Sequence, residues 1–355
     1  MVKCILILYI FSLLMLASLP AQTRLNPDIS LVGDMRAFSH NNVEMPVENE
    51  KFNLAAPRAE LVIAGYLNPY ARADAVVAWE EGNNAAIEEV YASILRGLPL
   101  NMNLRVGKYR LEFGRLNPVH PHAYSFIYLP LPHEEFFGEE GLNDVAIRPS
   151  FLIPTGNFYT EVMGAVLKGD ALLSEEDAAA SDTGSTSARI KPGFFGRITT
   201  STAVSEFAEF SLGMSFVTSH YDPGQQLRAW IYGFDLKYKW KPNRNTSLTL
   251  EGEGLGNRRE KIEGSTNTSY GGYGYIDYRF RQKYNLGSIF EYTQGKLDNQ
   301  EHTRRNGLFV GFAPIEETSL VRLVGDWTKP KDADGFWTVT VQLVFSLGPH
   351  QPHNF

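Results

Sequence analysis

The sequence predicts an all-β protein, a transmembrane antiparallel β-barrel of about 16 strands. Strict alternation of side chains, regular spacing of strands and the lengths of the connections predict it. The alternation is clearest from Trp230 to Trp240. Every second residue there is large and apolar, and most of the intervening residues are small or charged, among them Gly233, Asp235, Lys237 and Lys239. A strand sends alternate side chains to opposite faces, so one face would meet lipid and the other water.

The first residues predict export. Met1-Val2-Lys3 is a short basic segment, an apolar run follows from Cys4 to Leu19, and small residues precede Ala21. This pattern is typical of a signal peptide over 1–21, with the barrel over 22–355. The alternative, a membrane anchor, is less favoured because the run is short and ends at Pro20. Cys4 is the only cysteine, so the mature chain would have no disulfide, thiolate nucleophile or cysteine metal site.

Sixteen segments read as strands, most of them about ten residues long, as a tilted crossing requires. Their ranges are 29–39, 58–67, 70–79, 87–96, 102–110, 142–153, 157–168, 192–202, 207–219, 228–240, 246–256, 270–281, 284–294, 305–314, 318–328 and 335–347. The connections alternate between short turns and long loops without a break. Outer-membrane barrels have short periplasmic turns and long external loops, so both termini are expected in the periplasm.

The last predicted strands repeat the alternation. Val339, Val341 and Leu343 alternate with Thr340 and Gln342. The apolar residues would face lipid, and the polar residues would line the interior. A barrel of sixteen strands leaves a lumen that side chains do not fill, so the interior is expected to hold water.

Composition agrees with an exported barrel. The mean hydropathy of −0.22 would suggest a soluble protein, but half of each barrel strand is polar. No later segment is long and apolar enough for a transmembrane helix. The net charge is −7, without the basic stripe of a nucleic-acid-binding protein.

The connection from Leu111 to Gly141 is unusual because it is rich in aromatic residues and proline. A mobile external loop would have the opposite composition. We therefore expect this loop to pack against the inner barrel wall.

At this loop the chain resembles the bacterial outer-membrane porins. The segment Phe136-Phe137-Gly138-Glu139-Glu140-Gly141 echoes the acidic-aromatic-glycine motif of their constriction loop, and Leu104–Gly114 looks like a strand of phosphate-selective-type and other porin-like proteins. The resemblance implies sixteen strands and a loop between the fifth and sixth strands that folds into the lumen. It also implies that acidic loop residues face a basic wall there.

Carried onto this sequence, the resemblance places acidic and basic candidates at a pore constriction. The acidic candidates are Glu134, Glu135, Glu139 and Glu140, and the basic candidates are Arg105, Arg110, Arg115 and Arg148. Opposed charges across a narrow wet channel sort ions by charge and size. The alternative is that these charges only solvate an external loop.

Histidines on the same loop raise a metal hypothesis. His120, His122 and His133, with Glu134 nearby, could bind zinc, although their spacing matches no strong zinc signature. A packing or turn role for the histidines is favoured. The sequence has no Gly-x-Ser-x-Gly elbow, no His-Glu-x-x-His and no phosphate-binding loop, so we expect no enzyme and no required cofactor.

The expected function is passive diffusion of small solutes or ions through a porin-like channel in the outer membrane. The first alternative is a ligand- or metal-binding (zinc-responsive) outer-membrane receptor or uptake barrel, and the second is a structural or adhesion barrel without an open pore. An energy-coupled receptor would need a plug domain and about 22 strands, for which the chain is too short. Expected partners are outer-membrane lipid and small solutes, with a homotrimer as one possible assembly.

Overall fold

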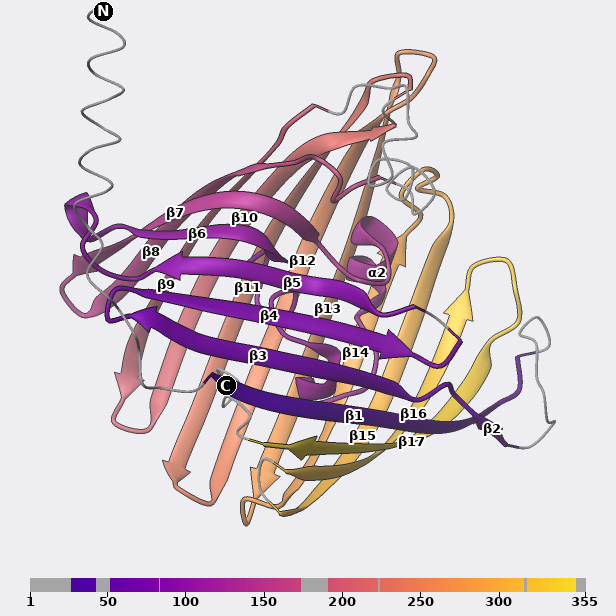
Figure 1. The fold of residues 1–355 in the computed structure, drawn as a ribbon. Helices are drawn as coiled ribbons and strands as arrows, with labels where there is room; N and C mark the ends of the chain where they lie inside the picture. Colours follow the sequence, from indigo (N-terminus) through magenta and orange to yellow (C-terminus); the bar gives the residue numbers. More distant parts are fainter. Residues whose placement is uncertain are drawn as a thin grey trace, which may run out of the picture.

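A computed structural model gives the fold, and it describes residues 27–42, 52–82, 84–173, 191–222, 224–315 and 318–348. Sixteen long strands form the barrel in the described part of the chain (Figure 1). They are β1 (Asp28–His40), β3 (Arg58–Asn68), β4 (Ala71–Glu80), β5 (Ala86–Ile94), β6 (Asn103–Arg110), β7 (Asn143–Thr155), β8 (Phe158–Leu167), β9 (Gly193–Ser205), β10 (Ala208–Asp222), β11 (Leu227–Asn243), β12 (Thr246–Glu260), β13 (Thr266–Phe280), β14 (Tyr284–Gln294), β15 (His302–Ile315), β16 (Ser319–Pro330) and β17 (Phe336–Leu347).

Each long strand pairs antiparallel with its neighbours in sequence order, and β1 pairs with both β3 and β17. That last pairing closes the sheet, which removes every free edge. The predicted closed barrel is therefore confirmed. The predicted signal peptide, residues 1–21, lies outside the described residues.

Several strands extend beyond their predicted ends on the long-loop side. The loop predicted over 257–269 shortens, because β12 continues to Glu260 and β13 begins at Thr266. A short additional strand, β2 (Asn53–Leu54), pairs with Ala37 and Phe38 of β1. Backbone pairing stabilises a hairpin in water as well, so strand length is not limited by the apolar band that marked these segments in the sequence.

The two faces of the barrel are inverted relative to a soluble protein. Leu308 on the outer face is 69% exposed, whereas Gln342, which points inward, is fully buried. Gln342 donates to Asp34 and accepts from Arg322 on neighbouring strands. Polar groups inside and large apolar groups outside are the arrangement a lipid environment requires. No helix in the described ranges is both long and apolar enough to cross a membrane.

The two ends of the barrel differ. One end carries tight turns, such as those at 156–157, 206–207 and 244–245, and the start of β1 and the end of β17 lie there. We call this the short-turn end. The chain between β6 and β7 does not stay outside the barrel: its helix α2 (Leu131–Phe137) lies within the ring of strands (Figure 1).

Candidate pore constriction and lumen

The segment 111–142, which we call the inner loop, crosses the lumen. It leaves β6 on one side and contacts the wall from β10 to β17 on the other. Its polar contacts with that wall include Gly114 with Ser215, Arg115 and Leu116 with Glu253, Ser125 with Asp277, Leu131 with Glu291, Phe126 with Arg322 and Tyr128 with Thr340. The expectation that this loop packs against the inner wall is confirmed.

Apolar side chains attach the inner loop at two places. Around its start and its helix, Phe113, Phe136 and Phe137 pack against Val217 and Ile231 of the wall. In its middle, Leu116, Tyr124, Phe126 and Ile127 pack against Tyr273, Ile289, Phe309 and Val324. The aromatic composition that distinguished this loop in the sequence is therefore used to bury it.

One glycine allows the closest approach. A Cβ atom on Gly233 of β11 would lie 2.6 Å from the ring of Phe113, which is closer than side-chain atoms pack. Gly233 alternates with bulky outward-facing residues, so the small inward position is what admits the loop.

Glu253 of β12 is the principal polar anchor of the inner loop. Its Oε1 accepts the backbone N–H groups of Arg115 at 2.7 Å and Leu116 at 3.0 Å, and the hydroxyl of Tyr273 at 2.8 Å. Its Oε2 lies 3.2 Å from Nε2 of His133, which is fully buried in α2. A buried carboxylate that satisfies this many donors fixes the position of both the first turn and the helix.

A second anchor joins the inner loop to β3 and β5. Nδ1 of His120 lies 3.3 Å from Glu60 and 3.6 Å from Glu88, and its Nε2 lies 3.7 Å from Glu89. Burial opposes a charge on His120, but the hydrogen bonds to Glu60 and Glu89 outweigh it and raise the pKa of the imidazole to about 9. Protonated His120 therefore supplies a positive charge among three carboxylates.

The predicted metal residues are divided between these two anchors. His120 and His122 stack with ring centroids 5.7 Å apart and both lie beside Glu60, whereas His133 contacts Glu253. Ligand atoms of Glu60, Glu88 and His120 do lie within 4.8 Å of one another, so these residues could hold a cation. However, Arg58 already donates to both carboxylates, and a cation would have to compete with that guanidinium.

The structure gives the predicted basic residues partners other than the predicted glutamates. Arg105 and Arg148 both bind Glu112, at 2.9 and 3.0 Å, and Arg115 binds Asp235 at 2.8 Å. Arg110 is buried, and its backbone N–H donates to Glu89.

The predicted acidic residues lie in and after α2. Glu135 accepts the backbone N–H of Lys296, and Glu134, Glu139 and Glu140 are exposed. Partial desolvation by the surrounding lumen wall raises the pKa of the Glu134 carboxyl. Within the described ranges no ion pair joins these four glutamates to the four arginines. The charges that hold the loop, Glu112, Asp235 and Glu253, were missed. Their only sequence signal is an inward-facing position in a strand or next to one.

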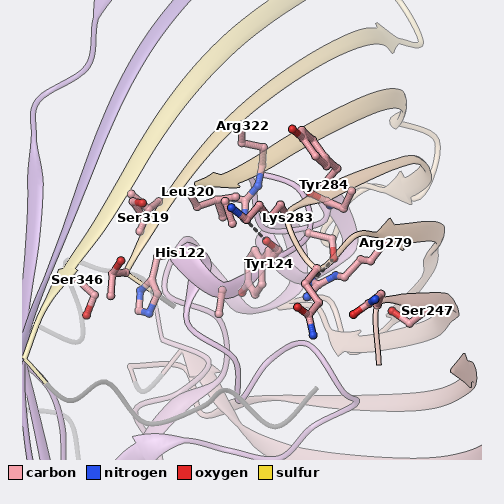
Figure 2. A pocket seen from close by; sticks show the side chains of 18 of the residues that line it. His122, Tyr124, Ser247, Arg279, Lys283, Tyr284, Ser319, Leu320, Arg322 and Ser346 are labelled. Atoms are coloured by element: carbon pink, nitrogen blue, oxygen red, sulfur yellow. Dashed lines mark hydrogen bonds between the residues drawn. The ribbon is translucent and has the colours of Figure 1, made fainter. Parts of the chain in front are cut away.

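Two connected cavities lie beside the inner loop. The first, of about 330 Å³, lies toward the short-turn end and is drawn in Figure 2. The second, of about 420 Å³, lies beside Glu112, Arg115 and the wall strands β8 to β13. Tyr124, Ser125, Ser247 and Arg279 line both cavities, so the two meet at the middle of the inner loop.

Comparison with known proteins identifies structural relatives and one sequence relative. No family model matches the chain. An uncharacterized protein from Aquifex aeolicus (strain VF5) is 28% identical over 390 residues, which cover 93% of this chain and 80% of that protein.

Among solved structures, an anion-selective porin from Comamonas acidovorans has a TM-score of 0.61 at 10% identity, covering 90% of this chain and 98% of that one. The outer membrane channel DcaP of Acinetobacter baumannii has a TM-score of 0.57 at 10% identity, covering 92% and 99%. A trimer form of OmpT, an outer membrane protein of Vibrio cholerae, has a TM-score of 0.58 at 8% identity, covering 91% and 100%. The closed barrel and these likenesses together establish that the chain has the fold of the outer-membrane porins.

Proposed function

We propose that the protein is an outer-membrane channel through which small solutes diffuse passively. The observation that carries the proposal is the inner loop, which crosses a sixteen-stranded barrel and leaves charged, connected cavities beside it. A barrel built only as a scaffold has no need of a narrowed interior. Charged walls and a narrowed lumen are the features by which channels select solutes.

The apolar outer face and the predicted signal peptide support placement in the outer membrane. The short-turn end, with the start of β1 and the end of β17, would then face the periplasm. The constriction would lie where the two cavities meet, beside Ser125 and Arg279. A homotrimer stays a prediction, supported by the trimer form of the Vibrio cholerae protein.

The test is single-channel conductance of the refolded barrel in a planar bilayer. We expect discrete current steps. Ser125→Trp should lower the step size by roughly half or more, because a bulky ring would enter the narrowest wet region. Leu308→Trp adds the same ring on the outer face and should leave the steps unchanged.

Silence from a correctly inserted barrel would contradict the channel and favour a receptor or a structural barrel. For the receptor alternative, the cluster of Glu60, Glu88 and His120 is the specific place to look for zinc binding. We do not favour it, because Arg58 and protonated His120 already balance those carboxylates.

A further inference from the structure

The charged side chains that line the cavity at the short-turn end are positive. Its lining contains six cationic side chains, and no carboxylate among the described residues. The cationic residues are Lys239, Lys241, Arg244, Arg279, Lys283 and Arg322. Figure 2 shows Arg279, Lys283 and Arg322 around this space. We call it the cationic chamber.

Strand geometry explains how the lysines gather there. Lys239 and Lys241 alternate with Trp240 on β11, so the pleat turns both toward the lumen while the indole lies outside. Arg279 lies opposite Ser247 in the pairing of β12 with β13. Arg244 and Lys283 stand in the adjacent turns. Four neighbouring elements thus direct cations into one space.

Most of the six cationic side chains have no ion-pair partner among the described residues. Arg279 binds Asp277 at 3.0 Å, and Arg322 donates to loop carbonyl oxygens and to Gln342. By contrast, in the part of the chain that the structure describes, the side chains of Lys239, Lys241, Arg244 and Lys283 form no ion pair.

The remainder of the lumen differs from the chamber, because many of its cations are matched with carboxylates; Arg110 and Arg259, which form no ion pair among the described residues, are buried and line neither cavity. Arg36 binds Asp34, Arg105 and Arg148 bind Glu112, Arg197 binds Asp235, Lys237 binds Glu251, and Arg305 binds Glu291. Even Lys237, which lies two residues before Lys239 on the same strand, has its own carboxylate. Cations that line a cavity without an ion-pair partner among the described residues are therefore concentrated at the short-turn end.

A cavity with walls of one charge sign focuses the field and concentrates ions of the opposite sign. Several lysines and arginines can also donate hydrogen bonds to several oxygens of one anion at once. The neutral donors Ser247, Asn285 and Ser319 lie among them.

We propose that the cationic chamber binds small oxyanions that carry two or more negative charges, and that these are the solutes the channel prefers. The preference of the channel for these anions rests on the proposed function, whereas their binding in the chamber does not. A solute with several carboxylate or phosphate groups would bring the counter-charge that the wall lacks. The chamber would thereby draw such anions to the end of the pathway that opens at the short turns.

Isothermal titration calorimetry of the refolded, full-length barrel with inorganic pyrophosphate tests the site. The double variant Lys241→Gln/Lys283→Gln changes two exposed side chains, and Lys239→Gln/Arg244→Gln can be added to it. We expect the dissociation constant to rise by roughly tenfold or more in the double variant, since focused charge changes local ion concentrations by about 10- to 1,000-fold. The matched control, Lys261→Gln/Lys329→Gln, makes the same net charge change on residues outside the chamber and should bind like the parent protein.

Channel currents provide the second readout. Pyrophosphate added at the short-turn side should block chloride current in the parent and in the control, and much less in the chamber variant.

No pyrophosphate binding, or equal weakening in both double variants, would overturn the site. Binding that depends on the chamber in a barrel that conducts nothing would refute the channel and leave the site standing. Steady conduction without pyrophosphate binding that depends on the chamber would refute the site and leave the proposed channel standing.

Discussion

Two regions of the same lumen use charge in opposite ways. Where the inner loop meets the wall, the buried carboxylate of Glu253 has several donors: Arg115, Leu116, Tyr273 and His133. In the cationic chamber, Lys239, Lys241 and Lys283 form no ion pair with any residue that the structure describes. Matched buried charges fix a segment in place, because separating them leaves an uncompensated charge. Unmatched charges in a wet cavity stay available for a mobile counter-ion. The difference separates the part of the interior that builds the constriction from the part that can recognise a solute.

Removal of the principal anchor, Glu253, is the strongest test of the difference between these two regions. Glu253→Ala should lower the free energy of unfolding by about 3–5 kcal/mol, since it leaves His133 and several backbone donors without their buried acceptor. The loop should also move more, which would appear as noisy current steps. Urea unfolding followed by tryptophan fluorescence measures the first effect.

Glu161→Ala is the control for Glu253→Ala. Glu161 lines the second cavity, and its side chain forms no ion pair or hydrogen bond within the described ranges. An equal loss of stability in both variants would show that Glu253 is not an anchor.

The second anchor should respond to pH. The pKa of His120 is raised to about 9, from about 6.5 for an ordinary histidine. The folded state therefore binds this proton more tightly than the unfolded state. The contribution of His120 is complete below about pH 6.5 and is lost as the pH rises through about 9.

The protonation of His120 contributes up to roughly 3 kcal/mol, at about 1.4 kcal/mol per pKa unit. The free energy of unfolding, measured at pH 7 and pH 10 for the parent and for His120→Gln, tests this. The two proteins should differ clearly at pH 7 and much less at pH 10. A difference that does not change with pH would exclude a charged His120.

The smallest expected effect comes from converting a matched site into an unmatched one. Glu112→Gln leaves Arg105 and Arg148 without their shared carboxylate at the edge of the second cavity. We expect the ratio of anion to cation permeability to rise by roughly two- to threefold, because one uncompensated charge is added to the lumen. Reversal potentials in asymmetric KCl measure the ratio.

Glu80→Gln, an exposed change at the end of β4, is the control and should leave the ratio unaltered. A fall in the ratio for Glu112→Gln would mean that the matched pairs do not shape selectivity.

The sequence by itself determined the barrel. Alternation with a period of two is a local property of each segment. A one-residue shift of a strand would turn its apolar face toward the lumen, so each strand and its two faces can be predicted without knowing the neighbouring strands. The aromatic and proline-rich composition of 111–141 also indicated that the loop is buried, and its place between the fifth and sixth long strands is confirmed.

Only the tertiary structure decided which charges meet. Glu253 follows the loop residue Arg115 by 138 positions, and Arg322 follows Tyr124 by 198. Partners at such separations depend on barrel closure and on strand register, which no local pattern encodes. The sequence therefore placed the candidate constriction residues on this loop and wall, but only the structure pairs Arg105 and Arg148 with Glu112, and Arg115 with Asp235. Their role at a constriction stays a prediction. The cationic chamber shows the same limit: Lys239 and Lys241 are visible as inward-facing positions in the sequence, but the absence of a facing carboxylate among the described residues appears only when four separate elements come together.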